Sequence, residues 1–132
     1  VGVVALAGVI IWQMQSDEAT PNEDTTLTLQ NTWQLTKIGG VDPTAPITLT
    51  IAGGQASGQA PCNGYSGPVN SDKETLTLGP MISTMMACDE LDLEVRYMQM
   101  LDQVAGYRIN GTTLQLTDAG GQVVLTYEYV QQ

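Results

Sequence analysis

The sequence predicts an α+β domain, in which a curved antiparallel β-sheet (a half-barrel-like meander) packs on one α-helix. Short segments after residue 26 alternate apolar with polar residues, which is the period of a sheet with one face on a core. The turn pair Asn110-Gly111 separates two of them and is a strong signal for a hairpin. One stretch, residues 89–105, has the period of a helix instead. With 132 residues, the chain fits one domain of ordinary size.

The predicted strands share this alternation and are bounded by turn residues. They are residues 26–30, 33–38, 47–51, 55–60, 75–79, 107–109, 112–117 and 122–130. Because the connections between them are short, we expect neighbours in sequence to be neighbours in the sheet.

The predicted helix has signals at both ends. Asp89 is expected to cap its start, and Gly106 suits its end. Its apolar face is broad, which predicts a helix lying in the hollow of the curved sheet. That face contains Leu91, Leu93, Val95, Tyr97, Met98, Leu101, Val104 and Ala105.

Glu94 falls on the same apolar face, and three interpretations are open. Its stem can pack at the rim while its carboxylate reaches water. Alternatively, a partly buried carboxylate accepts hydrogen bonds from a neighbouring loop. A catalytic acid would need a second carboxylate, and the sequence offers no obvious partner.

The first 26 residues differ from the rest. Residues 1–14 are almost entirely apolar, and we interpret them as a membrane-anchor or signal remnant. A signal-peptidase site at residues 5–7 and a buried element of the domain are the alternatives. Residues 15–26 are acidic and contain a proline, which indicates a solvated tether. The folded domain is therefore expected at residues 27–132.

Composition narrows the possible functions. Fourteen acidic and four basic residues give a net charge of −10, which disfavours nucleic acid as a partner. The chain has no histidine, so histidine-dependent catalytic triads and zinc sites are excluded. We expect no metal, no cofactor and no enzymatic activity.

Several motifs in order resemble the META/HslJ domain family. They are "WQLTKIGG", "ITLTI", "ASGQAPCNGYSG" and "ISTMMACDE", followed by Glu94, and the resemblance covers about residues 31–129. The matching positions are Trp33, Leu35, Gly58, Cys62, Asn63, Tyr65, Gly67, Thr84, Met86, Ala87, Cys88 and Glu94. Pro61 and Val69 depart from the pattern. Val9 stands where lipoprotein relatives carry the lipidated cysteine, which leaves the mode of anchoring open.

The resemblance implies a curved antiparallel sheet with one helix. It also implies a bacterial envelope protein linked to stress response or secretion, with no named catalytic activity. Our first hypothesis is a non-catalytic, monomeric soluble domain outside the cytoplasmic membrane, held there only by the N-terminal anchor and acting on an unknown protein partner. The alternatives are a binder of small apolar ligands in the hollow of the sheet, and a hydrolase that uses carboxylates.

The chain has two cysteines, Cys62 and Cys88, and their spacing is not that of a redox motif. Acidic residues surround Cys88 and disfavour a reactive thiolate. In an oxidising compartment the two would form a disulfide; two buried thiols are the alternative. Asn63 then either shapes a loop fastened by the disulfide or contributes to a small recognition site.

Five methionines lie in or near the predicted helix. They are Met81, Met85, Met86, Met98 and Met100. We expect them to fill the core, with an adaptable binding surface as the alternative.

Overall fold

The computed structural model describes residues 27–131. The anchor expected at residues 1–14 and the tether expected at residues 15–26 lie outside this range. Within it, no helix has the length and hydrophobicity needed to cross a bilayer.

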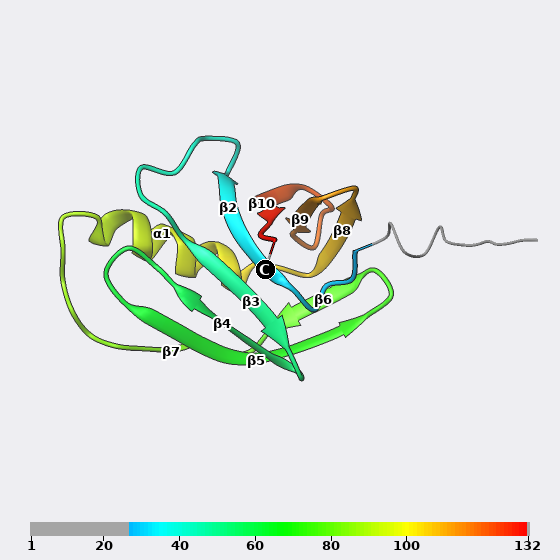
Figure 1. The fold of residues 1–132 in the computed structure, drawn as a ribbon, viewed down its shortest axis with the longest axis horizontal. Helices are drawn as coiled ribbons and strands as arrows, with labels where there is room; N and C mark the ends of the chain where they lie inside the picture. The colour runs from blue at the N-terminus through cyan, green and yellow to red at the C-terminus, as the bar shows by residue number, and fades with distance from the viewer. Residues whose placement is uncertain (1–26, 132) are drawn as a thin grey trace, which may run out of the picture.

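Nine strands and one helix make up the described part of the chain (Figure 1). The strands are β2 (Thr32–Ile38), β3 (Thr48–Ala52), β4 (Gln55–Gln59), β5 (Gly64–Asp72), β6 (Thr75–Leu78), β7 (Ile82–Ser83), β8 (Gly106–Asn110), β9 (Thr113–Thr117) and β10 (Val123–Tyr129). The helix α1 (Leu91–Asp102) lies between β7 and β8 in the chain.

Eight of the strands form a closed antiparallel barrel, which corrects the predicted half-barrel. The order is β4-β3-β2-β10-β9-β8-β6-β5, and β5 pairs back onto β4. Strands that follow one another in the chain pair with each other, as expected, from β2 to β6 and again from β8 to β10. The closing contacts join β10 to β2 and β6 to β8, and no pattern in the local sequence predicts such distant pairs. The ninth strand, β7, pairs with one end of β5.

Two strand predictions were wrong. The strand predicted at residues 26–30 does not form within the described residues 27–30, and residues 29–31 form bends. Leu29 is nevertheless buried, and its carbonyl accepts a 3.1 Å hydrogen bond from the Trp33 indole nitrogen. Residues 60–70 are rich in Gly, Pro, Asn and Ser, which favour turns, so no strand is predicted there, yet residues 64–72 form β5. It has partners along both edges, and these ladder hydrogen bonds override weak strand propensity.

The helix is shorter and its buried face narrower than predicted. Asp89 does not cap it: Glu90 occupies the N-cap position without a side-chain capping bond. Gly106 belongs to β8 rather than to the helix end. Leu91 and Val95 are 36% and 47% exposed, because the barrel contacts only one stripe of the helix.

Tyr97 points from that stripe into the barrel. Its hydroxyl lies 2.7 Å from that of Tyr65 on β5 and 2.8 Å from that of Tyr127 on β10, strands that are four places apart in the ring of eight. The Tyr65 hydroxyl also donates to the Thr48 carbonyl at 2.7 Å. These three buried tyrosines tie the helix to two opposite walls of the barrel.

The tyrosines make stability sensitive to alkali. Burial first, and repulsion between neighbouring phenolates second, raises the pKa of Tyr65, Tyr97 and Tyr127 well above the ordinary value of about 10. The unfolded chain therefore loses these protons at lower pH than the folded protein does.

We predict that the free energy of unfolding is constant from pH 8 to about 9.5 with respect to these groups, and falls above about pH 10. Each buried tyrosine contributes a slope of about 1.4 kcal/mol per pH unit. Urea titrations at several pH values measure this slope. The variant Tyr97→Phe should reduce the slope by the contribution of one tyrosine. A stability that is unchanged up to pH 11 would contradict the prediction.

Candidate functional site

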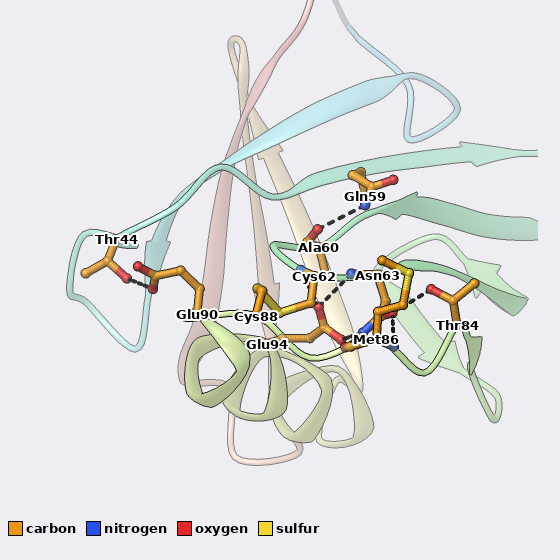
Figure 2. Close-up of a disulfide and its surroundings, with 10 residues drawn as sticks. All are labelled: Thr44, Gln59, Ala60, Cys62, Asn63, Thr84, Met86, Cys88, Glu90 and Glu94. Atoms are coloured by element: carbon orange, nitrogen blue, oxygen red, sulfur yellow. Dashed lines mark hydrogen bonds between the residues drawn. A yellow bond between two sulfur atoms is a disulfide. The ribbon is translucent and has the colours of Figure 1, made fainter.

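The cysteine loop faces the start of α1, and a disulfide between Cys62 and Cys88 joins them (Figure 2). The two Cα atoms are 5.5 Å apart, within the range that a disulfide requires. The alternative of two buried thiols is thereby excluded. The covalent link fixes residue 88, just before the helix, to the loop between β4 and β5.

The Glu94 carboxylate is buried beneath this loop and accepts three hydrogen bonds from it. Oε1 accepts from the backbone N–H groups of Cys62 and Asn63 at 2.8 and 3.0 Å, and Oε2 accepts from the Asn63 side-chain amide at 2.6 Å. The side chain is only 5% exposed. Glu94 also lies in the first turn of α1, where the helix dipole stabilises a negative charge. This is the arrangement of a buried carboxylate that binds a neighbouring loop, rather than the rim position.

The Asn63 side chain uses its full hydrogen-bonding capacity. Besides its bond to Glu94, Nδ2 donates to the Met86 carbonyl at 2.8 Å. Oδ1 accepts from the Met86 backbone N–H at 2.7 Å and from the Thr84 hydroxyl at 2.6 Å. A side-chain amide has two N–H donors and one oxygen that accepts two hydrogen bonds, and all four positions are used here. Asn63 therefore fixes residues 84–86 to the barrel, and no part of it remains available to bind a ligand.

Two glycines of the motif are required by close packing. A Cβ atom on Gly58 would lie 2.0 Å from the Thr48 carbonyl oxygen. One on Gly67 would lie 2.7 Å from both the Met81 sulfur and the Pro80 carbonyl oxygen. Neither position accepts a side chain, so these glycines serve the fold.

The structure brings most of the expected motif residues together. Cys62, Cys88, Asn63, Thr84 and Glu94 form one bonded cluster, shown in Figure 2. Trp33 does not join it. Its ring is fully buried in the core, where it packs edge-on against Tyr129 with ring centroids 6.0 Å apart.

Sequence reasoning missed the tyrosine hydroxyl network and the surface position of two methionines. Met81, Met98 and Met100 pack against the core, as expected. Met85 and Met86 are 94% and 65% exposed, so core filling was wrong for them. The motif residues Thr84 and Asn63 were the available signal that Met85 and Met86 lie at the surface. Hydrogen bonds from the Asn63 side chain to Thr84 and Met86 hold residues 84–86 there.

The Glu94 carboxylate is bonded, and the hollow of the sheet is filled. The Glu94 carboxylate is occupied by its three donors, and residues 27–131 contain no cluster of three metal-ligating side chains. Packed side chains fill the hollow of the sheet, where the alternative hypothesis places a small apolar ligand. Those with less than 2% exposure include Trp33, Leu49, Leu76, Tyr97, Leu101, Leu114, Leu116, Leu125 and Tyr127.

The motif cluster and the fold agree with a family assignment. The family model of the META domain matches residues 25–131. The chain belongs to the META domain family. No sequence among curated proteins matches it.

Solved structures similar to this META domain share its fold. One is the NMR structure of a protein from Burkholderia xenovorans, with 25% identity and a TM-score of 0.63, covering 93% of this chain and all of the other. Another is the crystal structure of a DUF4847 family protein from Bacteroides vulgatus, with 13% identity and a TM-score of 0.60, covering 79% of this chain and 95% of the other. At such identity the second shows the fold alone.

We predict that replacing Cys62 with serine destabilises the protein by about 3 to 4 kcal/mol, because the disulfide closes a span of 26 residues. Cys88→Ser and the double variant should lose the same amount, since one bond is lost in each case. Urea titration measures the loss, and reduced wild-type protein is the matched control. Two titratable thiols in unreduced, denatured protein would contradict the bond.

We predict that Glu94→Gln costs about 1.5 to 3 kcal/mol, because an amide replaces a charged acceptor of three hydrogen bonds. Glu74→Gln, at an exposed position of the β5–β6 turn, is the matched control and should change stability by less than about 0.5 kcal/mol. Faster hydrogen exchange at the Cys62 and Asn63 amides should accompany the Glu94 loss. Equal effects of the two variants would show that the buried carboxylate does not stabilise the loop.

Proposed function

We propose that this protein is a non-catalytic META domain that is displayed in the bacterial envelope outside the cytoplasmic membrane and acts by contacting another protein. The observation that carries the proposal is an exposed apolar stretch beside the motif cluster. Ile82 and Met85 are 76% and 94% exposed, and Met86 is 65% exposed. Exposed apolar side chains that are held in place by a rigid framework are typical of protein interaction sites.

The motif cluster supports this role by acting as a scaffold. The Asn63 amide is saturated with hydrogen bonds, and the disulfide adds a covalent tie beside it. A preorganised surface loses less conformational entropy when a partner binds. The polar groups of the cluster thus favour a rigid binding surface over chemistry.

The disulfide and the N-terminal sequence favour an extracytoplasmic location. Disulfides persist in oxidising compartments such as the periplasm or the cell exterior. The apolar run at residues 1–14 provides an anchor, and the acidic tether at residues 15–26 separates it from the folded domain. A role in stress response or secretion follows from the likeness to META/HslJ domains and is part of the proposal.

Site-specific photo-crosslinking in the producing bacterium tests the proposal. A photoreactive amino acid at Met85 should give a discrete protein adduct in the membrane fraction. The same group at Asn110, an exposed residue at the end of β8, is the control and should not give that adduct. Absence of an adduct from position 85, or recovery of the protein in the cytoplasmic fraction, would overturn the proposal.

A further inference from the structure

The strand β7 (Ile82–Ser83) is the outer edge of the sheet beside β5, and residues 84–87 continue this edge without being part of a strand. Ser83 and Ile82 lie opposite Tyr65 and Ser66, and the Thr84 N–H donates to the Gly64 carbonyl at 3.3 Å. The Asn63 amide then continues the ladder, because it both donates to and accepts from the Met86 backbone. Residues 84 and 86 thus direct their backbone groups toward the barrel.

The backbone groups of the intervening residues point the other way. In an antiparallel ladder, hydrogen-bonding residues alternate with residues whose N–H and C=O groups face outward. Thr84 bonds inward, so Ser83 and Met85 face outward. Within residues 27–131, β7 is the terminal strand of the sheet, so no further strand pairs with the outward side of Ser83. Such an edge is a template for an added strand.

The edge is apolar in its side chains and stiff in its backbone. Residues 82–87 carry no charge, and the exposed Ile82, Met85 and Met86 offer apolar contacts. The disulfide at Cys88 and the Asn63 amide hold the far end of the edge. The edge therefore loses little conformational entropy when a strand binds to it.

Charge complementarity selects the occupant. The edge leads directly into Asp89, Glu90 and Asp92, and Asp89 and Asp92 are exposed. A second copy of this chain, with a net charge of −10, would bring the same acidic residues and be repelled. A partner strand that runs antiparallel to residues 82–87 places its amino end next to Asp89. Basic residues at that end are therefore favoured.

We propose that residues 82–87 bind an extended segment of another protein by β-strand addition. The bound segment has alternating apolar side chains and basic residues at its amino end. The inference rests on the proposed function, because it specifies how that protein contact is made. Backbone hydrogen bonds to Ser83 and Met85 supply the pairing, and Asp89 and Asp92 fix its direction.

The test uses the isotope-labelled full chain and a synthetic peptide of alternating valine and threonine that begins with two lysines. We expect saturable NMR shift changes at the Ser83 and Met85 amides, and slower hydrogen exchange there. A peptide with two glutamates in place of the lysines should bind at least tenfold more weakly. Two further peptides form a matched pair: one carries N-methyl groups on the odd-numbered backbone nitrogens and the other on the even-numbered ones. Only one of the two should bind, because only one keeps the N–H groups that face the edge.

Two protein variants complete the test. Ser83→Pro removes an outward-facing N–H without removing a bond to β5, and an edge strand accepts proline. It should bind the peptide at least tenfold more weakly at an unchanged melting temperature. Met85→Lys, at a 94% exposed position, should weaken binding of the basic peptide as well, whereas Asn110→Lys should not.

Three results would overturn the inference. They are absence of saturable shifts at residues 83 and 85, equal binding of the two methylated peptides, and concentration-dependent shifts of these amides without peptide. The last would identify a second copy as the occupant. A failure here combined with a Met85 adduct in cells would leave the proposed protein contact intact, whereas absence of that adduct concerns the proposed function itself.

Discussion

The Glu94 carboxylate lies buried between the helix and the loop that joins β4 to β5, and within residues 27–131 no lysine or arginine side chain is hydrogen-bonded to it. Transferring Glu94 from water into the space beneath the loop is costly unless donors replace its hydration. Two consecutive backbone N–H groups and one side-chain amide do so. Because these donors must converge on one point, the loop at residues 62–63 has little freedom in the folded state. The carboxylate thus determines where the helix starts relative to the barrel.

That constraint extends outward to the surface. Asn63 is oriented by Glu94, and in turn holds Met86 and Thr84. The disulfide from Cys62 to Cys88 adds a covalent tie over the same span. The result is a chain of bonds from a buried charge to an exposed, uncharged sheet edge. The buried residues Glu94 and Asn63 therefore set the position of the exposed residues 84–86.

The interior of the closed barrel is filled by side chains. Eight strands in a ring leave a central space, and core side chains occupy it. Tyr97 of the helix reaches between opposite strands, where it meets Tyr65 and Tyr127. Within residues 27–131, the sheet edge beside β5 is where a terminal strand and exposed apolar side chains coincide.

Local periodicity was sufficient to predict most of the alternating strands and the single helix, and motif residues such as Asn63 were sufficient to indicate the family. The sequence also left Glu94 as a choice between the rim and a bonded interior position. The folded structure places Glu94 in the bonded interior position, and local sequence could not predict this because the donors come from a loop more than thirty positions away. The same holds for the run at residues 64–72, whose composition reads as turns but which gains ladder bonds along both edges. Barrel closure and the exposure of Met85 likewise depend on contacts between distant segments, which local sequence preferences do not encode.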